Sequence, residues 1–373
     1  MNPLIQLGEL GQSVWLDFIR RNFVTAGDLR RLIDGDGLKG VTSNPTIFQK
    51  AISGGTDYDD DIAASVREGL DTPAIYESLV VEDIRLAADV LWPVYEATGG
   101  RDGFVSLEVS PDLAHDAART VEEARRLWGR VDKSNLMIKV PATAEGLPAV
   151  TQLLGEGINV NVTLLFAVEV YENVVEAFFR GMEAAAEAGR DLGRINSVAS
   201  FFVSRIDTRV DAEVRQRLAA QPAAEERRKL DNVKGRVAIA NAKMANESCR
   251  RLFSSDRWRA LAARGATTQR LLWASTSTKD PDYRDVLYVE ELAGPDTVNT
   301  LPPETIDAFR DHGRVRRAID EDLDGARRVL ADLADLGISL GEVTDALTKE
   351  GVAKFADSFH ELLDAIEKEK EKV

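Results

Sequence analysis

The stretch Leu136-Met137-Ile138-Lys139-Val140-Pro141 is a short apolar run that ends at a proline, which is typical of a buried β-strand. Two comparable runs follow at residues 158–163 and 195–203. The remaining runs of this kind lie at residues 14–18, 40–42, 104–109, 271–275 and 296–300. Segments of helical period separate the runs; in residues 163–189, for example, apolar side chains recur every three or four residues and Gly189 is a suitable helix end. Eight such units predict a parallel sheet closed into a (β/α)8 barrel.

The main alternative to a barrel is an open, doubly wound sheet. That fold normally carries a glycine-rich phosphate-binding turn after its first strand, and no such turn follows Asp17. We therefore expect one barrel domain over residues 1–373, with a helical insertion at about residues 207–256 and C-terminal helices at about residues 304–373. Within the insertion, the polar stretch 212–232 is expected to lie on the surface, flanked by helices.

The C-terminal region carries two further helix signals. Ser339 and Glu342 have the spacing of a capping box. An apolar stripe at helical spacing follows, made of Val352, Phe355, Phe359, Leu362 and Ile366. We expect this stripe to pack on the barrel, because an apolar helix face is more often core than a partner site.

Composition excludes several classes of protein. The 373 residues include 47 Lys and Arg against 63 Asp and Glu, a formal net charge of −16 at pH 7, which argues against binding to nucleic acid or to an acidic membrane. The lone Cys249 and three histidines leave no disulfide and no histidine-rich or cysteine-rich metal site. No apolar run approaches the roughly 18 residues of a membrane-spanning helix, and residues 1–9 lack a signal-peptide pattern. We expect a soluble, cytoplasmic protein.

In a barrel of this kind, polar side chains near the carboxyl ends of the strands are the first candidates for chemistry. These candidates are Asp17, Asn44, Glu108, Lys139, Asn161, Thr163, Ser200 and Ser275. Lys139 is the most informative, because it lies inside an apolar strand. Burial favours the neutral amine of a lysine, and a neutral amine attacks carbonyl groups to form a Schiff base. The alternative is a lysine whose stem is buried and whose ammonium reaches solvent. Lys243, in contrast, is expected on the surface of a helix.

Two carboxylates lie in apolar runs, Asp17 and Glu108. Near a lysine they could act as general acid and base, or they could simply form ion pairs with it. Asn44 could hold a substrate hydroxyl, although an Asn-Pro pair also favours an ordinary turn. Asn161 and Thr163 alternate with valines, which places both on one strand face, where substrate, water or neighbouring side chains could satisfy them.

Two segments are candidates for binding phosphate. Arg205 follows the sixth strand, and an arginine suits bidentate phosphate binding. Residues 275–279, after the seventh strand, supply hydroxyls and the charge of Lys279. A loop rich in Ser and Thr is also common without such a role, so this second signal is weak by itself.

Taken together, several segments resemble the transaldolase family. The similar segments, in the family's order and spacing, are residues 40–46, 137–146, 158–166, 200–207 and 273–277. The resemblance covers most of the chain and is closest to the longer bacterial subgroup. It implies a class I aldolase-like barrel without metal or cofactor. It also implies transfer of a dihydroxyacetone unit from sedoheptulose 7-phosphate to glyceraldehyde 3-phosphate, giving erythrose 4-phosphate and fructose 6-phosphate in the non-oxidative pentose phosphate pathway.

The resemblance also implies a role for each candidate residue. Lys139 would form the Schiff base and Asp17 would exchange the proton of the C4 hydroxyl. Glu108 and Thr163 would hold the water that moves protons during imine formation. The substrate-binding residues implied are Asn44, Asn161, Ser200, Phe202, Arg205, Ser275, Ser277 and Lys279.

One departure from the family pattern concerns the phosphate site. Shorter members have an arginine two residues after the serine of the seventh strand, whereas Ser277 stands at that spacing after Ser275 here. Lys279 could supply the missing charge.

Two other functions compete with transaldolase. The first is a Schiff-base aldolase that releases dihydroxyacetone; Glu108 favours transfer, since the related fructose 6-phosphate aldolases resemble a shorter chain with glutamine at that place. The second is a silent barrel that binds sugar phosphates, which would require replacement of Lys139 or Asp17, and both are present.

Overall fold

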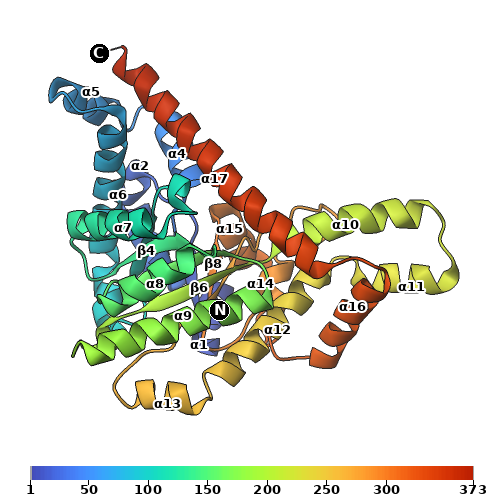
Figure 1. The fold of residues 1–373 in the computed structure, drawn as a ribbon. Helices are drawn as coiled ribbons and strands as arrows, with labels where there is room; N and C mark the ends of the chain where they lie inside the picture. Colours follow the sequence, from blue (N-terminus) through green and yellow to red (C-terminus); the bar gives the residue numbers. More distant parts are fainter. Residues whose placement is uncertain (1, 373) are drawn as a thin grey trace.

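The computed structural model describes residues 2–372, and within them eight parallel strands close into a barrel in sequence order (Figure 1). The strands are β1 (Gln12–Leu16), β2 (Gly40–Val41), β3 (Phe104–Glu108), β4 (Leu136–Pro141), β5 (Val160–Leu165), β6 (Ser197–Phe202), β7 (Arg270–Ala274) and β8 (Thr297–Leu301). Pairing of β1 with β8 closes the sheet. The predicted (β/α)8 barrel is confirmed, and each strand lies within a few residues of its predicted run.

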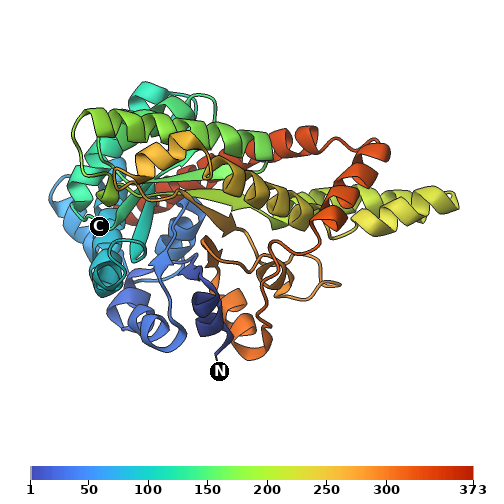
Figure 2. The ribbon, with the colours of Figure 1, turned by 90° about the horizontal axis from the view of Figure 1, so that it is seen from below.

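Helices follow the strands and cover the outside of the barrel (Figures 1 and 2). From α1 to α9 they are α1 (Pro3–Leu10), α2 (Arg21–Thr25), α3 (Asp28–Asp36), α4 (Pro45–Ser53), α5 (Asp59–Arg67), α6 (Thr72–Ala97), α7 (Ala117–Val131), α8 (Gly146–Gly155) and α9 (Val168–Glu187). The others are α10 (Ser204–Ala219), α11 (Ala224–Val233), α12 (Val237–Leu252), α13 (Asp256–Ala262), α14 (Leu287–Glu291), α15 (Pro303–His312), α16 (Leu323–Asp335) and α17 (Leu340–Lys370). Two 3₁₀ turns are η1 (Pro111–Leu113) and η2 (Leu192–Arg194).

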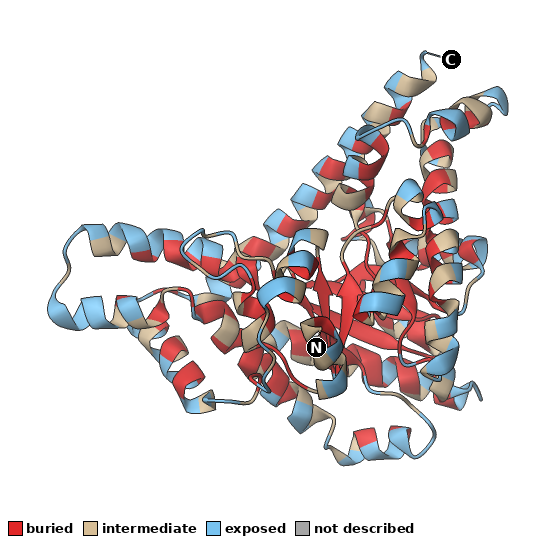
Figure 3. Ribbon diagram, turned by 180° about the vertical axis from the view of Figure 1, so that it is seen from behind, coloured by how far each residue is buried: buried red, intermediate tan, exposed pale blue. Residues whose placement is uncertain are grey.

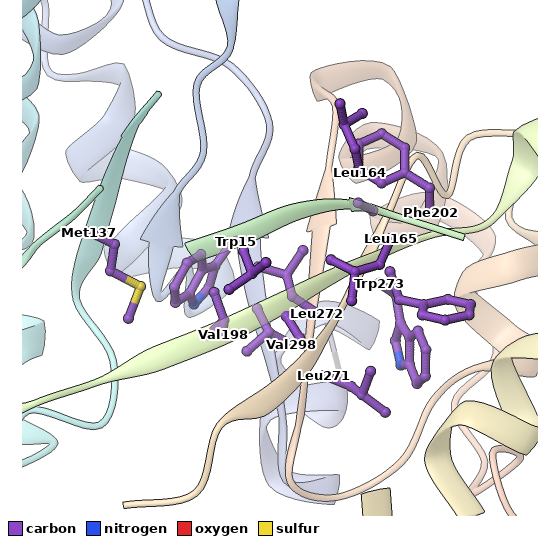
Figure 4. Close-up of a cluster of buried hydrophobic side chains, with 14 of the residues drawn as sticks. Trp15, Met137, Leu164, Leu165, Val198, Phe202, Leu271, Leu272, Trp273 and Val298 are labelled. Carbon is purple, nitrogen blue, oxygen red and sulfur yellow. The ribbon is translucent and has the colours of Figure 1, made fainter. Parts of the chain in front are cut away.

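The core lies in and around the strands, which are buried along their whole length (Figure 3). Figure 4 shows part of it, including Leu272 of β7 and its register partner Val298 of β8. At the amino-terminal end of the barrel, Arg270 and Asp102 form a buried ion pair of 2.9 Å. Ser13 Oγ donates to the same carboxylate at 2.8 Å. Arg270 and Asp102 therefore neutralise each other's charge inside this end of the barrel.

Two local predictions need correction. The helical pattern was expected over residues 163–189, but β5 continues to Leu165 and α9 begins only at Val168. The stretch 212–232 was expected as a surface insertion between helices, yet most of it belongs to α10 and α11, which project from the barrel as an antiparallel pair (Figure 1). The stretch does lie on the surface, and its polar composition reflects helices that are exposed on most sides.

A third correction concerns Lys243, which was expected on the surface. It is buried on α12, because α12 packs against α16. Its ammonium donates a hydrogen bond of 2.9 Å to the carbonyl oxygen of Glu321. A lysine on a mainly polar helix face can thus be covered by a neighbour that is distant in sequence.

The C-terminal helix α17 has 31 residues and is capped by Ser339, whose Oγ accepts from the backbone N–H of Glu342 as the capping signal predicts. It crosses the structure from the side of α10 to the side of α5 (Figure 1). Phe355, Leu362 and Ile366 of its apolar stripe are buried, so the stripe does pack on the rest of the chain.

Among residues 2–372, no helix has the length and apolar character needed to cross a membrane.

Candidate active site

A cavity of about 290 Å³ opens at the carboxyl ends of the strands. All the predicted site residues except Glu108 and Asn161 line it, namely Asp17, Asn44, Lys139, Thr163, Ser200, Phe202, Arg205, Ser275, Ser277 and Lys279. The tertiary structure thus brings together side chains that extend over most of the sequence. In the described part of the chain, no group of three or more His, Cys, Asp and Glu residues is arranged to hold a metal ion.

Lys139 lies in β4 with only 4% of its surface exposed. Its Nζ donates to the carbonyl oxygen of Ser43 at 3.0 Å and lies 3.3 Å from Oε2 of Glu108. The ring centroid of Phe355 lies 6.0 Å from the same nitrogen. The side chain therefore does not extend into bulk solvent, and its amine is held at the wall of the cavity by polar partners.

Glu108 stands next to Lys139 on β3, at the same register position. It is buried, and apart from this ion pair neither of its carboxylate oxygens has a hydrogen-bond partner among the described residues. Burial raises the pKa of the Glu108 carboxyl, and the positive charge of Lys139 lowers it in part. A carboxyl group with a raised pKa holds a proton more readily than an exposed one, which suits proton transfer.

Asp17 follows β1 directly, and its backbone N–H donates to the carbonyl oxygen of Leu301 at 2.8 Å. Its Oδ1 accepts a hydrogen bond of 2.7 Å from Thr42 Oγ1, which lies 2.7 Å from Thr300 Oγ1. Burial raises the pKa of the Asp17 carboxyl, whereas Lys139 and the Thr42 hydroxyl lower it. Asp17 is therefore a second candidate for proton transfer, and in the order of strands β3, which carries Glu108, lies between β1 and the strand of Lys139.

Asn44 serves local structure and also lines the cavity. It is the N-cap of α4, and its Oδ1 accepts from the backbone N–H of Ile47 at 3.0 Å. Pro45 occupies the first turn, where a missing N–H is tolerated. The turn chemistry that Asn-Pro favours is thus the means by which the Asn44 side chain is fixed beside the cavity.

Asn161 and Thr163 lie on β5, where Asn161 is in register with Lys139. The Asn161 amide donates to Ser106 Oγ at 3.0 Å and accepts from Ser200 Oγ at 2.7 Å. Asn161 is thus satisfied by neighbouring side chains and lies behind the cavity wall. Thr163 Oγ1 is buried, lines the cavity and has no hydrogen-bond partner among the described residues.

The expected phosphate side is formed by α10 and the loop after β7. The Arg205 guanidinium carbon lies 5.2 Å from the ring centroid of Phe202. Burial lowers the pKa of Arg205, and the charge of Asp17 opposes this. Ser275, at a φ of +56°, lies with its Oγ 2.9 Å from Ser204 Oγ. Lys279 donates to Ser277 Oγ at 2.7 Å, so it is directed back along its own loop.

Comparison with known proteins agrees with this geometry. The family model for transaldolase/fructose-6-phosphate aldolase matches residues 14–366. The chain belongs to this family. It is 48% identical to a transaldolase of Trichodesmium erythraeum, with 100% of this chain and 98% of that protein covered. It is 49% identical to transaldolase 2 of a Nostoc species and 50% identical to a transaldolase of Thermobifida fusca, each over 98% of this chain and 97% of the relative. This identity over the full length supports transaldolase function.

Several residues that line the cavity are not among the site residues predicted from the sequence. They are Phe18, Thr42, Thr46, Ile47, Lys50, Ala274, Thr300, Pro302, Pro303, Glu304, Lys354 and Phe355. Thr42 and Thr46 lie inside the segment that resembles the family, so their polar side chains were a usable signal. Phe355 was assigned only to packing. Nothing local marks Lys354, because α17 reaches the cavity only through long-range packing.

Proposed function

We propose that the protein is a transaldolase of the non-oxidative pentose phosphate pathway and that Lys139 is its Schiff-base residue. It moves a dihydroxyacetone unit from sedoheptulose 7-phosphate to glyceraldehyde 3-phosphate. The observation that carries the proposal is a buried lysine amine at a cavity wall, 3.3 Å from the buried carboxylate of Glu108.

The first step is imine formation. Within the ion pair, Lys139 passes a proton to the Glu108 carboxylate. The neutral Lys139 amine then attacks C2 of the ketose, and the resulting carbinolamine loses its hydroxyl as water to give a protonated imine. Glu108 supplies the proton with which the carbinolamine hydroxyl leaves as water, through a water molecule that it shares with Thr163. The unpartnered oxygens of Glu108 and Thr163 support this pairing, because buried polar groups are normally hydrogen-bonded.

The second step is cleavage of the carbon–carbon bond. The Asp17 carboxylate takes the proton of the C4 hydroxyl, the C3–C4 bond breaks, and its electron pair moves into the protonated imine to form an enamine. Erythrose 4-phosphate leaves as the aldehyde. The proximity of Asp17 to Lys139 and its hydrogen bond from Thr42 support this role.

Transfer reverses these steps on a new acceptor. The enamine carbon attacks the aldehyde carbon of glyceraldehyde 3-phosphate, and the protonated Asp17 returns its proton to the forming C4 oxygen. Water then adds to C2, the C2–N bond breaks, and fructose 6-phosphate and free Lys139 result. Protons and electrons balance over the cycle without an external oxidant or reductant.

The remaining residues bind the sugar. We assign Asn44 and Ser200 to hydroxyls of the three-carbon unit, with Asn161 holding Ser200 in place through its hydrogen bond. Phe202 supports Arg205, which binds the phosphate with Ser275, Ser277 and Lys279. The proposal includes a cytoplasmic location, because the phosphorylated sugars of this pathway are the substrates.

The test is reduction with borohydride in the presence of fructose 6-phosphate, read by peptide mass spectrometry. A three-carbon adduct on the peptide that contains Lys139 is expected, since cleavage leaves the dihydroxyacetone unit on the amine. Lys139→Met should abolish both the adduct and turnover. Lys243→Met, which removes another buried ammonium, is the matched control and should keep both.

A coupled assay separates transfer from release. The family model includes fructose-6-phosphate aldolase, and that activity would set dihydroxyacetone free. Release as fast as transfer would contradict the transaldolase proposal. A folded protein that binds sugar phosphate but forms no adduct would be a silent barrel instead.

A further inference from the structure

The C-terminal helix α17 forms part of the cavity wall. Phe355 and Lys354 both line the cavity, and the Phe355 ring lies 6.0 Å from the Lys139 amine. Gly351, one turn earlier, lies so close to the barrel that a Cβ atom there would be 2.9 Å from Leu164 Cδ2 and 3.5 Å from Arg205 Nη1. The absence of a side chain at Gly351 therefore lets α17 approach Arg205.

Two contacts hold α17 in this position, one on each side of Lys354. Glu350 accepts from Arg209 Nη1 at 2.6 Å, and Arg209 lies one turn after Arg205 on α10. Ser358 Oγ lies 2.8 Å from Thr46 Oγ1 on α4, the helix that Asn44 caps. Residues four apart lie on one face of a helix, so Glu350, Lys354 and Ser358 share a face. That face places Lys354 between the anchors on α10 and α4, at the cavity.

The charges around the cavity differ from those of the whole chain. The protein carries a net charge of −16, yet four cations other than Lys139 line this cavity: Lys50, Arg205, Lys279 and Lys354. Asp17 and Glu304 are the acidic residues of its lining. Lys354 has neither an ion pair nor a hydrogen bond to any described residue, whereas Lys279 is bonded to Ser277. Its ammonium is thus available to an anionic ligand.

We propose that Lys354 is a specificity-determining residue that binds the terminal phosphate of the sugar together with Arg205. This inference rests on the proposed function. Arg205 offers a planar, forked donor and Lys354 a compact charge, which together can contact several phosphate oxygens. One such site serves the acceptor and the product, because the phosphate of glyceraldehyde 3-phosphate becomes that of fructose 6-phosphate after transfer, and fructose 6-phosphate is the donor of the reverse reaction. Lys354 thereby supplies a cation to the cavity from α17, whereas Ser277 stands at the family's arginine position in the loop after β7.

The experiment compares fructose 6-phosphate with unphosphorylated fructose as donor, using erythrose 4-phosphate as acceptor. For Lys354→Gln, we expect kcat/KM for fructose 6-phosphate to fall about tenfold or more, the size of a lost charge-assisted hydrogen bond. The value for fructose should not change, and the inhibition constant of inorganic phosphate should rise in parallel. Lys354→Arg should restore most of the preference for the phosphorylated donor.

Lys349→Gln is the matched control, since it removes the same charge from an exposed position of α17 outside the cavity. Equal losses for both donors in Lys354→Gln would overturn the inference in favour of a structural role. Wild-type values of kcat/KM for both donors would also overturn it and would show Lys354 to be a solvated residue. These outcomes presuppose that the wild-type protein gives the three-carbon adduct and transfers it. Failure of that wild-type reaction would instead contradict the proposed function.

Discussion

Nζ of Lys139 and Oε2 of Glu108 lie 3.3 Å apart on adjacent strands, at the same register position and out of contact with bulk solvent. Desolvation makes a buried ion pair weak evidence for stability, so stability alone does not explain its presence. The pair places a proton-transfer group beside the nitrogen at which a carbinolamine would lose water. Burial raises the pKa of the Glu108 carboxyl, which favours its use as an acid in that step.

Replacement of the proposed cleavage base should separate imine formation from cleavage. Asp17→Asn keeps the shape of the side chain but removes the proton acceptor, so kcat should fall by about 10²–10⁴-fold. Borohydride should then trap a six-carbon rather than a three-carbon adduct on Lys139. Glu304→Gln, which changes another carboxylate of the cavity wall, should retain the three-carbon adduct. Near-normal turnover of Asp17→Asn would assign the proton transfer to another group.

The hydroxyl of Thr42 should control the pH dependence. Its hydrogen bond to Asp17 lowers the pKa of that carboxyl, so Thr42→Val should raise the pKa and move the acid limb of kcat/KM to higher pH. Activity at pH 6 should therefore decrease more than activity at pH 8. Thr300→Val is the control, because it removes the contact between the two threonines but leaves the bond to Asp17. An acid limb that stays in place in Thr42→Val would contradict the role of Asp17.

Lys279 should contribute to binding the phosphate. Lys279→Ala should raise KM severalfold for phosphorylated donors and leave kcat nearly unchanged, since the loss affects binding rather than the reacting atoms. Lys133→Ala removes a half-buried lysine outside the cavity and serves as the control. Steady-state kinetics with fructose 6-phosphate check this. If the kinetics do not change, Lys279 has no place in the site.

A buried carboxyl group behind the site should make stability depend on pH. Asp207 accepts from the Ala238 N–H at 2.8 Å and from the Tyr288 hydroxyl at 3.0 Å, and burial raises its pKa to about 7. Between its ordinary value of 3.8 and about 7, the folded state binds more protons than the unfolded state, so the free energy of unfolding falls as pH rises. This effect amounts to at most about 4 kcal/mol across the window.

Asp207→Asn should remove that dependence. The free energy of unfolding should be measured with urea at pH 5 and at pH 8. From pH 5 to pH 8, the wild type should lose stability relative to Asp207→Asn. Asp231→Asn, an exposed change on α11, is the control and should show no such shift. A difference that is constant with pH would mean that Asp207 titrates at its ordinary pKa in the folded protein.

The ion pair at the other end of the barrel should affect stability without affecting catalysis. Asp102→Ala leaves the Arg270 guanidinium buried without its carboxylate, although Ser13 and the Arg101 carbonyl still accept from it. The free energy of unfolding should fall by about 3–5 kcal/mol. Activity below the unfolding transition should remain, because the proposed catalytic residues lie at the opposite ends of the strands. A loss of kcat in the folded variant would show that the two ends are coupled.

Local sequence patterns were sufficient for most of the barrel. The strand around Lys139 is marked by its apolar neighbours and by Pro141, and β5 and β6 are marked in the same way. The site residues at the strand ends could be predicted because the carboxyl ends of parallel strands meet on one face of a barrel. Where composition was the only guide, as for residues 212–232, the stretch was expected between helices and instead forms most of α10 and α11, because exposed helices and polar connections have similar compositions.

The sequence by itself determined the order of strands and helices. It also indicated the type of chemistry, because it places a lysine in an apolar strand and carboxylates on other strands. What only the tertiary structure decided is which distant element covers which face. Lys243 is buried where α12 meets the chain at the start of α16, at the carbonyl of Glu321. Lys354 reaches the cavity because the hydroxyls of Thr46 and Ser358, 312 residues apart in the chain, are in contact. The physical reason is that periodicity reports which face of a helix is buried, whereas the identity of the covering element depends on non-local packing.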